Sequence, residues 1–204
     1  MSPSANEQRR QQGSGGLAID RLIDGATMVF GTYGFAKATV QDIAAAACVS
    51  KPIFYRHFEN KQAIFERVVE HVFAEWLKTL VEAISNTSGG AEAELRVFFL
   101  DSLEYGRQNT IIGRLLTRDA QFLISTQTPV TDRAVESLTR AIRDILRRGR
   151  RAGEIRKDLA LDHMADFLTE MHFAYANRQL VTGVPVAGKL AEELVEAMLA
   201  AVRA

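Results

Sequence analysis

A compact set of polar and aromatic side chains lies between residues 51 and 61, namely Lys51, Tyr55, Arg56, His57 and Lys61. Groups of these types donate hydrogen bonds, and phosphate oxygens and the edges of nucleic-acid bases are acceptors that suit them. Their spacing is typical of a short helix that presents a polar surface. An ordinary helical hairpin with solvated polar residues is the alternative that this pattern alone leaves open.

Helix-start signals around these residues predict two short helices with a tight turn between them. Thr39 and Asp42, three residues apart, form a capping-box pattern ahead of Ile43. Ser50 is the natural N-cap of the second helix, and Pro52 is tolerated because it lies in the first turn. Two short helices at an angle, the second with a polar surface, are the arrangement that places a helix in a DNA major groove.

Apolar spacing predicts which side of the second helix faces solvent. Phe54 and Phe58 are one helical turn apart, so we expect both to pack inward and leave the polar residues outward. Asn60 is then predicted to cap a long helix. Lys61 lies in the first turn of that helix, where the macrodipole disfavours a cation, and a nearby phosphate would resolve the conflict.

The segment 19–61, through F..YGFAKATVQDIAAAACVSKPIFYRHFENK, resembles the TetR-like (tetracycline-repressor) family of bacterial transcriptional regulators. The resemblance implies a helix-turn-helix head that binds DNA. It places Tyr55, His57 and Lys61 at phosphates, and Lys51 and Ile53 near base edges. The DNA-binding residues expected on this ground are Thr39, Ser50, Lys51, Ile53, Tyr55, Arg56, His57 and Lys61.

Cys48 departs from the family pattern. The family usually has Gly in the turn between the two helices, where a positive φ is often needed. We therefore expect modest strain or a slightly altered turn at this position. The expected role is that of a small buried residue, and a redox-sensing thiol is the alternative.

The composition indicates a globular protein. The chain has 204 residues, of which 47% are hydrophobic and 25% charged, enough for one good core or two small ones. No apolar run approaches the roughly 18 residues of a membrane span, and the single cysteine fits a reducing cytoplasm. The formal net charge is zero, so any affinity for DNA must come from the placement of charges.

The expected fold is all-α, with about nine helices. Residues 1–16 are predicted to be a flexible arm, 17–62 a three-helix helix-turn-helix head, and 63–204 a larger ligand-binding and dimerisation body. Helices in the body after the long connecting helix are expected at about 91–107, 111–125, 129–152, 159–181 and 188–203.

The family resemblance also implies roles for the body. It usually encloses an inducer pocket, and its last two helices, here 159–181 and 188–203, form the interface of a homodimer. Most of the large apolar side chains must be core, but some are expected to line the pocket. The candidate ligand-binding residues are Trp76, Phe98, Phe99, Ser102, Tyr105, Arg118, Phe122, Phe167, Met171 and Tyr175.

Enzyme and metal functions are disfavoured. The four histidines show no zinc-ligand spacing, and neither a phosphate-binding loop nor a G-x-S-x-G elbow is present. No metal or cofactor is expected. The arginines at 147–151 close a predicted helix and are expected to form a solvated cap rather than a nucleic-acid patch.

These observations predict a homodimeric, ligand-responsive transcriptional repressor in the cytoplasm. Its expected partners are a palindromic double-stranded operator, with half-sites about 34 Å apart, and a small apolar or aromatic inducer. The inducer would act through the helix that begins at Lys61. The rival functions are a helical enzyme that binds a small molecule and a protein–protein adaptor that uses the head as a docking surface.

Overall fold

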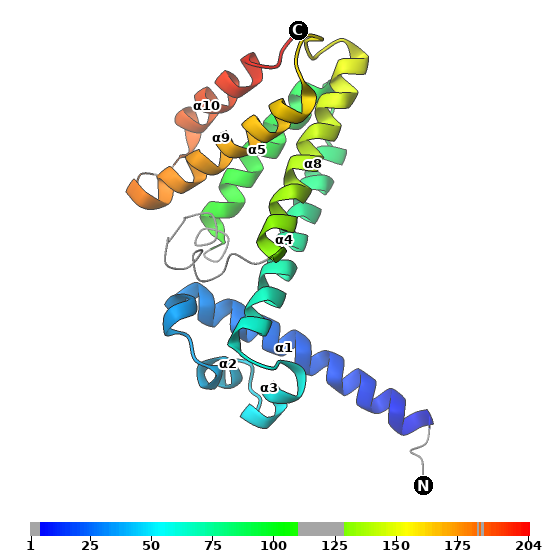
Figure 1. Cartoon of the computed structure of the whole chain (residues 1–204), viewed down its shortest axis with the longest axis vertical. Coiled ribbons are helices and arrows are strands. Elements are labelled where there is room, and N and C mark those ends of the chain that lie inside the picture. Colours follow the sequence, from blue (N-terminus) through cyan, green and yellow to red (C-terminus); the bar gives the residue numbers. More distant parts are fainter. Residues whose placement is uncertain (1–4, 110–128, 183, 185) are drawn as a thin grey trace. The chain divides into compact units, whose positions relative to one another are not determined.

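The computed structural model describes residues 5–109, 129–182, 184 and 186–204, and in these residues it contains eight helices (Figure 1). Outside helices, their only strand-like pairing is a bridge between Ile155 and Arg203. The predicted all-α class is thus confirmed. The helices are α1 (Ala5–Lys37), α2 (Val40–Ala46), α3 (Lys51–His57), α4 (Lys61–Ser85), α5 (Gly90–Gln108), α8 (Pro129–Ala152), α9 (Leu161–Thr182) and α10 (Gly188–Ala200).

The chain divides into two compact units, Met1–Val69 and Glu70–Ala204, which we call the head and the body. The division falls inside α4, so this helix begins in the head and continues in the body. In the body, the predicted helices at 91–107, 129–152 and 159–181 lie within two residues of the observed bounds. The helix predicted at 111–125 lies outside the described residues.

Two helix ends differ from the sequence-based prediction. α1 begins at Ala5, so most of the segment predicted as a flexible arm is helical. The stretch ANEQRRQQ consists largely of good helix formers, and their helix propensity outweighs the effect of the glycines that follow. α10 ends at Ala200 instead of 203, because the last residues turn back to pair with 154–156: Arg156 N–H donates to the Val202 carbonyl at 3.1 Å.

The core of the head forms where α1, α2 and α3 pack together. Phe30 and Phe65 meet edge-on with ring centroids 5.2 Å apart, and Phe35 lies against both. α2 comes close to α1 at Gly25, where a Cβ atom would lie 2.7 Å from the backbone nitrogen of Ala47. Only a residue without a side chain allows this approach.

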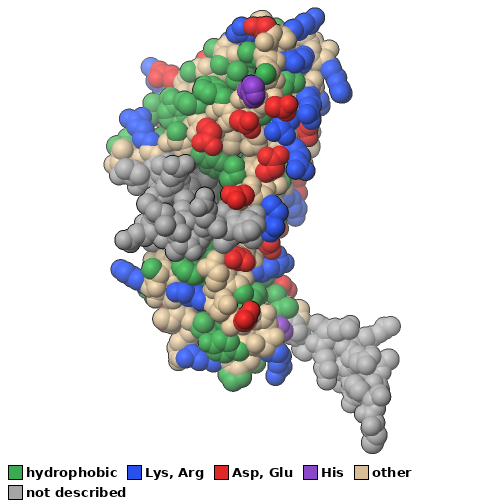
Figure 2. Space-filling view, viewed as in Figure 1, with side chains coloured by type: hydrophobic (Ala, Val, Ile, Leu, Met, Phe, Trp, Pro, Cys, Tyr) green, Lys and Arg blue, Asp and Glu red, His purple; other side chains and the backbone are tan. Residues whose placement is uncertain are grey.

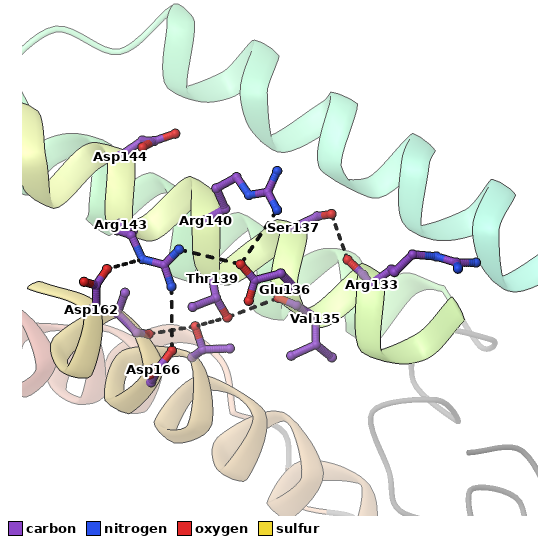
Figure 3. A network of polar contacts seen from close by, with 12 residues as sticks. Arg133, Val135, Glu136, Ser137, Thr139, Arg140, Arg143, Asp144, Asp162 and Asp166 are labelled. Atoms are coloured by element: carbon purple, nitrogen blue, oxygen red, sulfur yellow. Dashed lines mark hydrogen bonds and ion pairs between the residues drawn. The ribbon is translucent and has the colours of Figure 1, made fainter. Parts of the chain in front are cut away.

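Within the body, α5 packs against α8, α9 and α10, and α8 packs against α9. The apolar face of α10 is already used inside the chain, because Ala191, Val195, Met198 and Leu199 are buried. α8 and α9 are further joined by a polar network (Figure 3): Arg143 pairs with Asp162 at 2.8 Å, and the Thr139 and Thr169 hydroxyls lie 3.1 Å apart.

Three of the four arginines near the end of α8 are held by partners. Arg147 pairs with Asp144, Arg148 with Glu94, and the Arg150 guanidinium donates to the Leu159 carbonyl. Figure 2 shows basic and acidic side chains close together over this part of the molecule. The expected solvated helix cap is therefore mainly a set of side-chain ion pairs.

Gly25→Ala is expected to destabilise the head, because the added methyl group collides with the backbone of α2. Overpacking of this kind costs about 1–3 kcal/mol of unfolding free energy. Gly16→Ala is the matched control: nothing described lies within 4 Å of its Cβ position, and loss of a helix glycine should stabilise by roughly 0.5–1 kcal/mol. Urea unfolding measures both, and equal effects of the two substitutions would contradict the packing account.

Candidate functional site

The first helix of the helix-turn-helix begins at a reciprocal cap. The Asp42 amide donates to Thr39 Oγ1 at 3.1 Å, and the Thr39 amide donates to Asp42 Oδ2 at 3.0 Å, so the predicted capping box is confirmed. The Thr39 hydroxyl itself donates to Asp42 Oδ2 at 2.6 Å. Its single hydrogen is therefore already used, and donation to a DNA phosphate would require this bond to break.

Cys48 forms the turn between α2 and α3 in a left-handed conformation, with φ of 53°. The strain expected for a non-Gly residue here is thus present. The Val49 amide closes the turn by donating to the Ala44 carbonyl at 2.9 Å. The expectation that Cys48 is buried is wrong, because the turn directs its side chain outward, where it is exposed and free.

The second helix, α3, has three distinct faces. Phe54 is fully buried and contacts Phe58, which is half-buried, so the inward face is largely as predicted. On the outward face Lys51 and Arg56 are exposed, and Tyr55 keeps 56% of its surface accessible.

The flanks of α3 carry the remaining predicted residues of this helix. Ile53 and His57, one turn apart, are half-buried between the inward and outward faces. Ser50 is exposed and is the N-cap, as predicted, but its side chain makes no capping hydrogen bond. The predicted residues of α3 and its N-cap thus surround the part of the helix that Phe54 does not bury.

Lys61 differs most from its expected environment. Its ammonium donates to the carbonyl oxygens of Phe35 at 2.7 Å and Ala38 at 2.9 Å, and it lies 4.5 Å from the centre of the Phe35 ring. Burial lowers the pKa of Lys61. These carbonyls lie just beyond Gly34, where the helical backbone of α1 is interrupted. They resolve the conflict between the Lys61 charge and the α4 macrodipole without a phosphate.

Asn60 confirms the predicted start of α4. Its Oδ1 accepts the amide hydrogen of Ala63 at 2.9 Å. The backbone position from which the Lys61 side chain extends is therefore fixed by this capped first turn. Together, Asn60 and Lys61 fix where α4 leaves the head.

The candidate ligand-binding residues of the body fall into four groups. Trp76, Phe98, Phe99 and Ser102 are buried; Tyr105, Met171 and Tyr175 are half-buried; and Arg118 and Phe122 lie outside the described residues. Phe167 does not fit a pocket, because 47% of its surface is exposed. Its position on α9 faces away from α8 and α5, which apolar composition alone could not reveal.

Ser102 and His172 form a buried polar pair between α5 and α9. The Ser102 hydroxyl and His172 Nε2 lie 2.7 Å apart, and the rings of Phe98 and Phe99 contact the imidazole. Burial lowers the pKa of His172 to about 4, so the ring is neutral at neutral pH. No signal in the sequence identified Ser102 and His172 as partners.

Trp76 has no exposed surface and stacks on Tyr105, with ring centroids 6.0 Å apart and planes 13° from parallel. Its indole Nε1–H finds no acceptor in the described part of the chain. An unpaired buried donor costs roughly 1–3 kcal/mol. A nearby groove of about 230 Å³ lies between α4 and α8 and includes Phe73, whose ring centroid is 5.4 Å from that of Trp76.

The described residues contain no group of three or more His, Cys, Asp or Glu side chains that could hold a metal ion. In the same part of the chain, no helix has the length and apolarity needed to cross a membrane.

Comparison with known proteins gives consistent matches. The sequence model of bacterial regulatory proteins of the tetR family matches residues 22–68. The HTH-type transcriptional repressor DhaR of Mycobacterium sp. (strain GP1) is 31% identical over 148 residues, 72% of this chain and 74% of that protein. An uncharacterized HTH-type transcriptional regulator, YdgC of Bacillus subtilis (strain 168), is 25% identical over 179 residues, 88% of this chain and 89% of its own.

Among solved structures, SmeT shares the fold. It is the repressor of the Stenotrophomonas maltophilia multidrug efflux pump SmeDEF, and it superposes with a TM-score of 0.73 at 19% identity. The match covers 91% of this chain and 90% of that chain. The similarity therefore extends from the helix-turn-helix into the helices of the body.

The His172 environment predicts a pH dependence of stability. Between its ordinary pKa of 6.5 and its lowered pKa of about 4, the unfolded chain binds a proton that the folded chain excludes. Stability is therefore lost as the pH falls through this window, by roughly 2 kcal/mol between pH 7 and pH 5. His172→Gln should remove this component in urea unfolding, whereas His163→Gln, at an exposed position on the same helix, should retain it. Parallel pH profiles for all three proteins would refute the assignment.

Proposed function

Since the chain belongs to the tetR family of bacterial regulatory proteins, we propose that it is a ligand-responsive repressor that binds a palindromic operator as a homodimer. It is a DNA-binding transcription regulator, and the matched relatives are named as regulators, not as enzymes. The single observation that carries the proposal is the outward face of α3, where Lys51, Tyr55 and Arg56 are exposed beside a firmly buried Phe54. Such a regulator would act in the cytoplasm, where it meets chromosomal DNA.

On DNA, α3 lies in the major groove. Lys51 and Ile53 approach base edges near the start of the helix, whereas Tyr55 and His57 donate to phosphates. Arg56, also exposed, reaches the backbone on the same side. The half-burial of Ile53 and His57 supports these roles, since packing limits the rotamers in which they can be presented.

The remaining predicted contacts are of a different kind. Ser50 has a hydroxyl free of a cap bond and sits next to Lys51, so it joins the contact set. Thr39 contributes mainly by fixing the start of α2 through its capping box. Lys61 stabilises the head from within, and a phosphate contact would compete with its carbonyl acceptors.

Dimerisation through the last two helices is part of the proposal, with α9 as the larger contributor. The apolar face of α10 is occupied by α5, whereas α9 keeps the exposed stripe His163, Phe167, Glu170 and Ala174. Phe167 is the large apolar side chain in that stripe, and burial against a second copy explains its exposure in the single chain.

Release by a small molecule would act through α4. This helix is capped by Asn60, begins at Lys61 in the head and continues to Phe73 and Trp76 in the body. A ligand that prefers the DNA-free arrangement by a few kcal/mol is sufficient to lower operator occupancy substantially. A docking adaptor is disfavoured, because the outward face of α3 carries Lys51 and Arg56 instead of an apolar patch.

The operator itself can be tested by selection from a pool of random duplex DNA. The homodimer should enrich an inverted repeat whose half-site centres lie about 34 Å, or roughly one helical turn, apart. The two-fold axis of the dimer is the reason, since it presents two identical α3 helices. Enrichment of single half-sites would instead indicate that the protein binds DNA as a monomer. If no sequence is enriched at all, the proposed function is wrong.

Tyr55→Phe should weaken binding to the selected duplex by roughly thirtyfold, because the dimer loses two hydroxyl donors to phosphates, each worth about 1 kcal/mol. His57→Ala should have a similar or larger effect. Tyr33→Phe is the matched control, since Tyr33 also keeps 56% of its surface exposed but lies at the end of α1. The assignment fails if Tyr55→Phe and His57→Ala both bind like the wild type in fluorescence anisotropy.

A further inference from the structure

The buried polar side chains of the body are mostly paired with one another. Ser102 faces His172 at 2.7 Å, and Thr139 faces Thr169 at 3.1 Å. Trp76 is the exception among the uncharged groups of the described residues, because its indole N–H has no acceptor while its whole surface is buried. A donor of this kind, in a core where other polar groups are satisfied, indicates a missing hydrogen-bond partner.

The surroundings of Trp76 determine what that partner can be. Its ring contacts are aromatic, with Tyr105 stacked on one side and Phe73 tilted against it. Burial raises the pKa of Tyr105, so its phenol remains uncharged at neutral pH. An ion brought among these rings would lose its hydration without gaining an opposite charge. The site therefore favours an uncharged molecule with a flat apolar body.

A groove on the surface of the body shares Phe73 with the surroundings of Trp76. The groove between α4 and α8 is lined by Phe73 and Leu77, which flank Trp76 in the sequence, and by Leu138 from α8. Phe73 belongs both to the wall of this groove and to the Trp76 contact. A rotamer change of Phe73 would open the groove toward the indole, and the Glu70–Arg133 ion pair at 3.5 Å lies among the lining residues.

We propose that Trp76 Nε1–H is the hydrogen-bond donor for the effector, and that the effector is an uncharged aromatic molecule with a single acceptor oxygen, of the aryl ketone class. The proposal rests on the proposed function, since it specifies the ligand that releases the repressor. An aryl ketone places its ring on the aromatic side chains and its oxygen on the indole. A hydrocarbon of the same shape leaves the donor unpaired, and a carboxylate carries a charge that the site does not balance.

The chain has one tryptophan, so the indole N–H gives a single resonance in a ¹H–¹⁵N spectrum of the uniformly labelled protein. Acetophenone should move this resonance downfield, as a new hydrogen bond does. Isopropylbenzene, which has a similar shape and no oxygen, should not move it downfield, and benzoate should leave it in place. An indole resonance that ignores acetophenone, or that responds equally to isopropylbenzene, overturns the proposal.

Release from DNA gives the second test. With Trp76→Phe, which keeps an aromatic ring and loses the donor, about five to ten times more acetophenone should be needed to release the selected duplex. Tyr33→Phe, an exposed position on α1 in the head, should need the wild-type concentration. Circular dichroism melting verifies that both variants are folded.

The two outcomes separate this proposal from the one on which it depends. If acetophenone releases the wild type and Trp76→Phe at the same concentration, the protein remains a ligand-responsive repressor and the role of Trp76 is wrong. If the wild type binds no selected duplex, the proposed function fails, whereas the indole spectrum still reports whether Trp76 binds the ketone.

Discussion

The contact between the Lys61 ammonium and the carbonyl oxygens that follow the kink in α1 is the constraint on which the head depends. It joins residues 23 and 26 positions apart and so closes the chain around the whole helix-turn-helix. Closing that loop lowers the conformational freedom of α2 and α3 together. It also gives the cation in the first turn of α4 carbonyl acceptors, which offset its unfavourable interaction with the α4 macrodipole.

The outward orientation of the polar side chains of α3 follows from the Lys61 contact. With both ends of the segment held, Phe54 anchors the helix to the core and Gly25 lets α2 approach α1 closely. Lys51, Tyr55 and Arg56 are then outward because the inward positions are taken. The same contact fixes the first turn of α4, the helix that continues to Trp76 in the body. One ammonium group therefore constrains both the exposed surface of α3 and the start of α4, the helix through which we propose that the ligand acts.

Local signals in the sequence predicted the parts of the structure that local interactions determine. The capping box at Thr39, the cap at Asn60 and most helix bounds depend on residues within one turn of each other. The environments of Lys61, Cys48 and Phe167 were missed, because they depend on carbonyls, turns and helix faces set by distant segments. The unpaired indole of Trp76 is beyond sequence analysis for the same reason, since the sequence shows the donor but not the lack of an acceptor.

The dependence of operator binding on salt tests the role of Lys61 most directly. The slope of log K against log salt becomes shallower by about one unit for each phosphate contact that is lost. Lys61→Met, measured at a temperature where circular dichroism shows it folded, should retain the wild-type slope, because its ammonium binds carbonyls of the head. Arg56→Met, from the exposed face of α3, should show a shallower slope, because Arg56 is the cation proposed to reach the DNA backbone. A slope for Lys61→Met that is shallower by about one unit per subunit would contradict this role and show that Lys61 contacts a DNA phosphate.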